Sequence, residues 1–440
     1  MAAANDSVDW DYFISARGRK WQPSPIRGLF PLEATPGMIS FLAGKPNPTT
    51  FPFSSIAVTL KSVIEGETPV TLNIESDALN EALQYGPTAG LKGLVEWLEV
   101  LQETKHDRKR DGSWRLSVGS GSQDLIYKAF QSLINEGDSV LLEAPVYSGT
   151  LGLLVPEPAE FFEVPVDTEG LQPDVLEDML ANWSTQHPGK RFPKLLYTIP
   201  TGSNPTGCSS PLERKIKILA LARKYNLLIL EDDAYHFLHF DSKNQAASYF
   251  EIEAREGGAT GRVVRFDSFS KILSSGMRLG FISAAKPLVD AVDLMTSNTN
   301  LQGSSTTQAI ALALLNHWGL KGFFEHTARV AAFYKSKRDM FEAAAHEHLD
   351  DVATWVSPSS GMFLYLNLQL SSDPSIQGDS RALISTGALA KGVLAVPGSS
   401  FMPSRSASSC VRVAFSLATP EQADEGLRRL KEAILEARDA

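Results

Sequence analysis

Residues 268–280, SFSKILSSGMRLG, combine residue types that suit covalent chemistry. Lys271 and Arg278 stand among serines and glycines, and apolar, strand-like runs flank the stretch on both sides. A lysine in this setting can form a Schiff base with a carbonyl group, while the serines and the arginine can bind an anion. Ser268 and Lys271 also match an S-x-x-K acyl-serine site, but the sequence contains neither the S-D-N nor the K-T-G element that accompanies such a site.

Three further motifs carry polar residues to predicted strand ends or helix starts. Gly119-Ser-Gly-Ser-Gln123 opens a predicted helix, where small residues let backbone N–H groups approach an anion. Asn204-Pro-Thr-Gly207 follows an apolar run, and Glu231-Asp232-Asp233-Ala-Tyr235 ends another. Each motif alone also fits a turn or a helix cap. A metal site is the weaker interpretation of the carboxylates, because no second cluster of ligands accompanies them, and we predict no metal.

Pyridoxal phosphate would use all of these groups together. It needs an imine-forming lysine, a carboxylate that keeps the pyridine nitrogen protonated, donors near its phenolic oxygen and an anion site for its phosphate. The sequence offers, in that order, Lys271, then Asp232, then Asn204 with Tyr235, and finally Ser122, Gln123, Ser268, Ser270 and Arg278. This combination is far more specific than any one of the motifs.

The elements that must position these residues follow an α/β pattern. Helical periodicities alternate with apolar runs between about residues 70 and 300, which predicts a large α/β domain. The runs are continuously apolar rather than alternating, which is typical of strands buried on both faces of a mostly parallel sheet. They comprise residues 139–143, 194–199, 227–231, 262–266 and 279–283.

The two ends of the chain have a different character. Residues 1–60 are rich in Pro and Gly, and we expect an arm that contributes to the small domain and the active site. Residues 61–320 are then the large cofactor-binding domain, and residues 321–440 a small C-terminal α/β domain. The last helix has a predicted capping box, with Thr419 as N-cap, Pro420 at the first helical position and Gln422 completing the box.

The composition excludes several classes of protein. The 440-residue chain has a formal net charge of −10, which argues against nucleic acid or an anionic membrane as partner. No apolar run is long enough to span a membrane. Two cysteines do not make a disulfide framework, and the N-terminal residues match neither a signal nor a transit peptide. We therefore expect a cytoplasmic protein.

The motifs together carry a family resemblance over about residues 10–436. They are SGSQ, EAPVYSGT, PTGSNPTG, EDDAY, DSFSKILSSGMRLG and VRVAFS. With them the chain resembles the fold-type I pyridoxal-phosphate-dependent aminotransferases. Residues 23–27 (PSPIR), residues 83–90 (LQYGPTAG) and the spacing throughout narrow the resemblance to the kynurenine/2-aminoadipate and fungal aromatic amino acid aminotransferases. The resemblance implies a large domain with a mostly parallel seven-stranded sheet, a smaller α/β domain, and a homodimer with shared active sites.

The resemblance also implies roles for particular residues. Lys271 would bind the cofactor and move a proton at the substrate Cα, Asp232 would pair with the pyridinium nitrogen, and Tyr147 would stack on the ring. Asn204 and Tyr235 would hydrogen-bond the phenolic oxygen. The phosphate ligands would be Ser122, Gln123, Ser268, Ser270 and Arg278, with Tyr85 reaching the phosphate in the neighbouring subunit.

Four residues are expected to contact substrate. By the same resemblance, Arg412 would bind the substrate α-carboxylate as a bidentate pair, beside Asn204. Gly44 would line the substrate site, and Arg27 would contact the distal group of the substrate. Lys45, Ala234 and His236 depart from the family pattern and bear on substrate preference rather than on the chemistry.

The function that follows is ping-pong transamination. The donor would be an aromatic amino acid (Trp, Phe or Tyr), kynurenine or 2-aminoadipate, and the acceptor a 2-oxo acid such as 2-oxoglutarate. One alternative is another enzyme that uses this cofactor on the same fold, a β-lyase or a decarboxylase. A more remote one is a non-enzymatic regulator with the same fold, although no long basic segment precedes residue 20.

Overall fold

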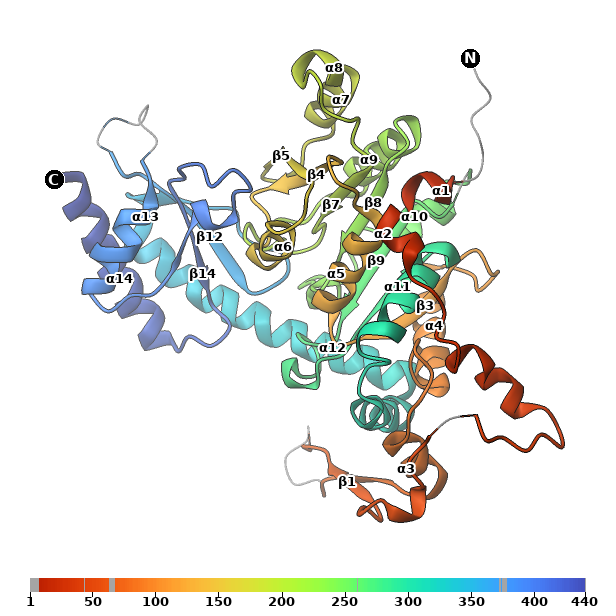
Figure 1. The fold of residues 1–440 in the computed structure, drawn as a ribbon. Helices are drawn as coiled ribbons and strands as arrows, with labels where there is room; N and C mark the ends of the chain where they lie inside the picture. Colours follow the sequence, from red (N-terminus) through yellow and green to blue (C-terminus); the bar gives the residue numbers. More distant parts are fainter. Residues whose placement is uncertain are drawn as a thin grey trace. The chain divides into compact units, whose positions relative to one another are not determined.

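The computed structural model describes residues 8–42, 44–62, 68–258, 260–371, 373 and 378–439, without the side chains of residues 27, 31, 34 and 439 (Figure 1). These residues fall into two compact units. The first contains the segments up to Asn135 and from Glu256 to Glu325, and the second contains Glu136–Arg255 and the chain from His326 onwards. The expected boundaries at residues 60 and 320 stay a prediction.

The first unit contains three antiparallel strands in the order β3 (Arg115–Gly119), β10 (Gly280–Ala284) and β9 (Val263–Ser268). Every residue of β9 and β10 is buried. The register places Gly280 opposite both Gly119 and Ser268. The three strand ends that carry the predicted anion-binding motifs therefore meet at one edge.

Helices pack on these strands. α5 (Ser122–Leu133) contacts β9, β10 and α11 (Lys286–Thr299), while α4 (Lys92–His106) contacts β3. α5 buries an apolar face, in which Leu125, Phe130 and Leu133 are almost fully enclosed. α12 (Ser305–Leu349) is interrupted at Gly319, whose φ of 60° is not helical.

The N-terminal part of the first unit is made of short elements. They are α1 (Trp10–Phe13), α2 (Ala16–Lys20), η1 (Arg27–Ala34), η2 (Pro48–Thr50), the antiparallel pair β1 (Ile56–Thr59) and β2 (Thr71–Ile74), and α3 (Ser76–Leu83). Ser15 links this segment to α5, because its Oγ donates to Gln131 O at 3.0 Å and its N–H donates to Ser132 O at 2.7 Å.

The second unit contains five strands of the large sheet. Their order is β8 (Leu228–Asp232), β7 (Leu195–Thr198), β4 (Ser139–Ala144), β5 (Glu160–Asp167) and β6 (Gly170–Leu171). β8, β7, β4 and β5 are parallel, whereas β6 turns back antiparallel to β5. All residues of β4, β7 and β8 are buried, as their unbroken apolar runs predict.

The helices between these strands are short. They are α6 (Ser148–Leu154), α7 (Pro173–Ala181), α8 (Trp183–Gln186), α9 (Leu212–Lys224), η3 (His236–Leu238) and α10 (Tyr249–Arg255). A helix after each parallel strand is the connection that such a sheet requires, because a tight hairpin joins only antiparallel strands.

A second, antiparallel sheet lies in the C-terminal part of the second unit. Its order is β11 (Ala353–Thr354), β12 (Phe363–Leu368), β14 (Cys410–Ala414) and β13 (Val396–Pro397). α13 (Ser380–Ala382), the π-helical turn η5 (Leu383–Ala388), η6 (Gly398–Phe401) and α14 (Pro420–Asp439) complete this part. The capping box is confirmed, since Thr419 Oγ1 accepts from Gln422 N at 3.2 Å and Gln422 Oε1 accepts from Thr419 N at 3.0 Å.

The expected α/β class with a mostly parallel sheet is confirmed. The large sheet has eight strands rather than the expected seven. The two-residue strand β6, which follows β5 through a turn at Asp167–Gly170, is too short to show a hydrophobic period. Among the described residues, no helix has both the length and the apolar character that a membrane span requires.

Candidate active site

Polar side chains gather where parallel strands of the second unit end. β8 ends at Asp232, and the loop after β7 contains Asn204; both side chains are buried, at 5% exposure each. Ligands bind at the carboxyl ends of strands in open α/β sheets, because the loops there converge at one edge. Two buried polar groups at this edge therefore mark a candidate site.

A buried tyrosine holds Asp232 in place. The Tyr197 hydroxyl donates to Asp232 Oδ2 at 2.6 Å and accepts a hydrogen bond from Thr150 Oγ1 at 2.8 Å. Tyr197 lies opposite Leu230 in the register of β7 and β8, so Asp232, two residues further along β8, shares its face. Burial and the Asp232 charge raise the pKa of Tyr197, so this hydroxyl stays a donor.

Glu143 is a second buried carboxyl group near this edge. It is the penultimate residue of β4 and lies beside Thr198 and Ser203, whose hydroxyls donate to its two oxygens at 2.7 and 3.1 Å. Burial raises the pKa of Glu143 to about 7, despite the lowering effect of these hydrogen bonds. Neither Tyr197 nor Glu143 is among the residues predicted from the sequence. The only signal was a polar side chain within an otherwise apolar run.

Asn204 contacts the arginine that the family resemblance assigns to the substrate. Arg412, on β14, donates from Nη1 to Asn204 Oδ1 at 2.8 Å. Its guanidinium carbon lies 4.3 Å from the ring centre of Phe363 and 5.0 Å from that of Phe401. Among the described residues, its buried Nε has no hydrogen-bond acceptor. The planar guanidinium is thus held between aromatic rings and keeps donors for a carboxylate.

Tyr235 lies at the centre of this group of residues. Its side chain is buried, and burial raises the pKa of its hydroxyl, which is hydrogen-bonded to Asn204. The charges of Asp232 and Arg412 also act on this hydroxyl, and Tyr147 lies close enough to affect its pKa. The structure therefore brings together the five predicted residues of the second unit, which are Tyr147, Asn204, Asp232, Tyr235 and Arg412.

The predicted anion-binding residues of the first unit also come together. Ser268 ends β9, and its Oγ accepts from the N–H of Ser270 at 3.2 Å. Arg278 donates to Ser270 Oγ at 3.3 Å through Nη1 and to Ser120 O at 3.3 Å through Nη2. One guanidinium therefore connects the loop after β9 with the loop that opens α5.

Glycines let the start of α5 approach these strands closely. A Cβ on Gly280 would lie 2.6 Å from Ser122 N, and a Cβ on Gly121 would lie 2.5 Å from Arg278 Nη2. Gly121 also has a φ of 90°, which side chains rarely tolerate. The space beside the first turn of α5 is bounded by backbone N–H groups, serines and an arginine, so its chemistry fits a phosphate.

Lys271 lies in the turn that follows β9. Its neighbours Phe269 and Ile272 are buried, whereas Lys271 is half-buried. These two apolar side chains pack in the core and hold the backbone of the turn, so the position of Lys271 between them is well defined. Gln123 follows Ser122 in the first turn of α5.

The remaining predicted residues are less constrained. Tyr85 is 52% exposed, and no described atom outside the adjoining chain lies within 4 Å of a Cβ built on Gly44. Arg27 begins η1, but its side chain lies outside the described residues.

An α/β fold with a carboxylate, a lysine and a candidate phosphate-binding site at strand ends is typical of one class of cofactor-dependent enzymes. The family model "Aminotransferase class I and II" matches residues 54–430. The chain belongs to this family, and it is an aminotransferase that uses pyridoxal 5′-phosphate. This assignment favours transamination over the β-lyase, decarboxylase and regulator alternatives.

Individual proteins show how similar the chain is to its relatives. Aminotransferase tdiD of Emericella nidulans is 46% identical over 98% of this chain and 97% of its own length. The mitochondrial kynurenine/alpha-aminoadipate aminotransferase of Mus musculus is 38% identical over 98% and 100%. The crystal structure of the aromatic aminotransferase Aro9 from Candida albicans superposes with a TM-score of 0.86, at 27% identity and 97% coverage of each chain.

Proposed function

We propose that the chain transfers the amino group of an aromatic amino acid (Trp, Phe or Tyr), of kynurenine or of 2-aminoadipate to a 2-oxo acid, 2-oxoglutarate in particular. The observation that carries this proposal is the Arg412 guanidinium, held by Asn204 and flanked by Phe363 and Phe401. The names of the mouse and Candida relatives support the same substrates. The test is a donor screen against 2-oxoglutarate, and turnover of none of these donors would refute the proposal.

The cofactor is proposed to be held by the residues that the sequence motifs supply. Bound pyridoxal phosphate supplies a carbonyl group and an electron-accepting ring. Ser122, Gln123, Ser268, Ser270 and Arg278 would bind its phosphate, Tyr147 would cover its ring, and Asn204 and Tyr235 would donate to its phenolic oxygen. Asp232 would hold the proton on the ring nitrogen. The Lys271 amine would bind the carbonyl carbon and then carry a proton at the substrate Cα.

The lysine assignment has a direct test. Lys271→Ala should abolish both turnover and the visible absorbance of the covalently bound cofactor, because no other amine is proposed to bind its carbonyl carbon. Lys286→Ala, an exposed lysine of α11, is the matched control and should change neither property. Persistence of turnover in the Lys271 variant would refute the assignment.

The arginine assignment predicts a uniform effect on substrates. Arg412→Lys replaces a planar donor pair by a single ammonium group, so KM for every amino acid donor should rise by about tenfold to a hundredfold. An effect confined to one donor class would show instead that Arg412 selects side chains. Arg27 and Gly44 are proposed to contact the distal part of the substrate, so Arg27→Ala should affect 2-aminoadipate more than phenylalanine.

A homodimer is proposed as the active assembly. Large apolar side chains of the N-terminal segment are exposed, including Phe41 at 96% and Ile39 at 78%, and Tyr85 is half-exposed. Apolar groups clustered on a surface commonly mark an interface. Tyr85 would then reach the cofactor phosphate of the neighbouring subunit. Sedimentation equilibrium should give a dimer mass, and Phe41→Asp should weaken it. A monomer that is fully active would refute the proposal.

The cytoplasm is proposed as the compartment of the protein. Cys208 and Cys410 are free thiols, as a reducing compartment favours, whereas the named mouse relative is mitochondrial. Fractionation of cells that express the natural chain would decide between these compartments, and recovery in the mitochondrial matrix would refute the proposal.

A further inference from the structure

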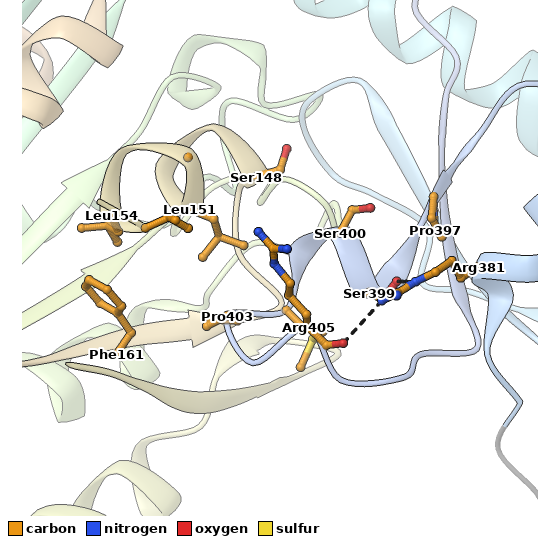
Figure 2. A pocket seen from close by; sticks show the side chains of 13 residues that line it. Ser148, Leu151, Leu154, Phe161, Arg381, Pro397, Ser399, Ser400, Pro403 and Arg405 are labelled. Carbon is orange, nitrogen blue, oxygen red and sulfur yellow. Dashed lines mark hydrogen bonds between the residues drawn. The ribbon is translucent and has the colours of Figure 1, made fainter. Parts of the chain in front are cut away.

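A second pocket lies within the second unit, formed by α6, the start of β5 and the loop 397–405 (Figure 2). Its volume is about 470 Å³, within the range of small-molecule sites. None of the five predicted active-site residues of the second unit lines it. One wall is apolar, with Leu151, Leu154 and Phe161, and the other carries Ser400, Arg381 and Arg405.

Arg405 brings a positive charge into this pocket. Among the described residues, its guanidinium makes no ion pair and no hydrogen bond, and no acidic residue lines the pocket. Figure 2 shows the guanidinium turned toward Leu151 rather than away from the pocket. In a chain with a net charge of −10, a cationic pocket without carboxylates is unusual.

Backbone conformation and backbone hydrogen bonds fix the loop at Arg405. Its φ of 55° is in the left-handed region, and its N–H donates to Met402 O at 2.9 Å. Arg381 donates to Ser399 Oγ at 3.3 Å and to Arg405 O at 3.5 Å. Ser404 N donates to Glu163 Oε1 at 2.7 Å, so this carboxylate holds the loop. Left-handed backbone at a non-glycine residue persists only where the surroundings enforce it.

The two walls together select the chemistry of a ligand. Leu151, Leu154 and Phe161 offer an apolar surface to a ring, while the Arg405 guanidinium and the Ser400 hydroxyl offer donors to an anion. A purely apolar ligand would leave the guanidinium without a counter-charge. A small inorganic anion would leave the apolar side chains of the other wall exposed to water. We propose that this pocket is a second ligand site that binds a small aromatic carboxylate, with its ring on the apolar wall and its carboxylate on Arg405.

Calorimetry with indole-3-acetate tests the proposal. This probe has the ring and the carboxylate but neither an amino nor an oxo group, so the enzyme cannot turn it over. The cofactor-loaded wild-type enzyme should bind it at two sites per chain, one in this pocket and one at Arg412. Binding of the probe at Arg412 rests on the proposed function, in which Arg412 binds the substrate carboxylate. Indole-3-acetamide, which lacks the charge, should bind the pocket at least tenfold more weakly.

Variants assign the two binding events separately. Arg405→Ala should weaken one event at least tenfold and leave kcat and KM for amino acid donors within twofold, while Arg405→Lys should retain part of the affinity. Arg428→Ala, an arginine on α14, is the control and should change neither event. Arg412→Ala should remove the other event.

Each outcome bears on one proposal. A single event in the wild-type enzyme that is lost in Arg412→Ala, or two events that both survive Arg405→Ala, would overturn the second site. Loss of one event in Arg405→Ala together with no effect of Arg412→Ala would support the second site and overturn the proposed carboxylate clamp.

Discussion

Replacement of Tyr197 by phenylalanine would remove one hydroxyl from the centre of the candidate active site. That hydroxyl donates to Asp232 Oδ2 at 2.6 Å and accepts from Thr150 Oγ1 at 2.8 Å, and all three side chains are buried. The variant therefore withdraws a donor from a buried carboxylate that is proposed to hold the proton on the cofactor ring.

The magnitude follows from the charge of the acceptor. A hydrogen bond to a charged group contributes about 1.5–3 kcal/mol, and each 1.4 kcal/mol corresponds to about tenfold in rate. If the hydrogen bond supports Asp232 mainly in its charged form, kcat/KM should fall by about tenfold to a hundredfold. Thr150 would also lose its acceptor, which costs about 1–3 kcal/mol of folding stability.

The assay must separate catalysis from folding. Half-reaction kinetics over a range of amino donor concentrations measure the second-order rate constant that corresponds to kcat/KM, and urea unfolding of the same samples measures stability. Tyr249→Phe is a matched control, because Tyr249 is also fully buried in the second unit but, among the described residues, makes no hydrogen bond to Asp232. The variant Tyr197→Phe should lose rate well beyond this control. Equal rates for both variants would refute a positioning role for Tyr197.

Three further predictions concern the candidate phosphate site beside α5, a buried carboxyl group and a helix cap. Gly121→Ala should weaken cofactor binding at least tenfold in an apoenzyme titration, because its Cβ would lie 2.5 Å from Arg278 Nη2, whereas Gly426→Ala, in open space, should not; equal affinities would contradict this. The raised pKa of Glu143, about 7 against 4.5, favours its protonated form in the folded state, so this contribution to stability is present below pH 4.5 and is lost as the pH rises to about 7. Between these pH values the wild type should lose about 3 kcal/mol more than Glu143→Gln in urea unfolding, and parallel profiles would refute the shift. Thr419→Ala should cost about 1 kcal/mol of unfolding free energy, because it removes the side-chain acceptor for Gln422 N; an unchanged midpoint would show that the cap is dispensable.

Much of the local structure could be predicted from the sequence. The run 194–199 is mostly apolar, and the strand found there, Leu195–Thr198, is buried at every position. The capping box at Thr419 forms as predicted. Such features depend on residues close together in the chain, so their periodicity and spacing carry the information.

Contacts between distant segments were not predictable in the same way. Tyr197 meets Asp232 only because β7 and β8 are neighbours in a defined register, and one residue of slippage would turn the tyrosine to the other face. Arg405 lines a pocket because its loop packs near α6, which lies more than two hundred residues earlier in the chain. Neither contact leaves a pattern in the sequence around either residue.

The sequence by itself determined the chemistry available to this protein. Its motifs supply a lysine, a carboxylate and a set of anion-binding residues, and together these motifs are specific enough to predict the cofactor and the family. Residue type sets what a group can do, and local spacing sets which element carries it. The tertiary structure alone decided which groups share an environment. Burial raises the pKa of Glu143, Tyr197 supports Asp232, and Phe363 and Phe401 flank Arg412, because packing joins strands and loops that are remote in the chain.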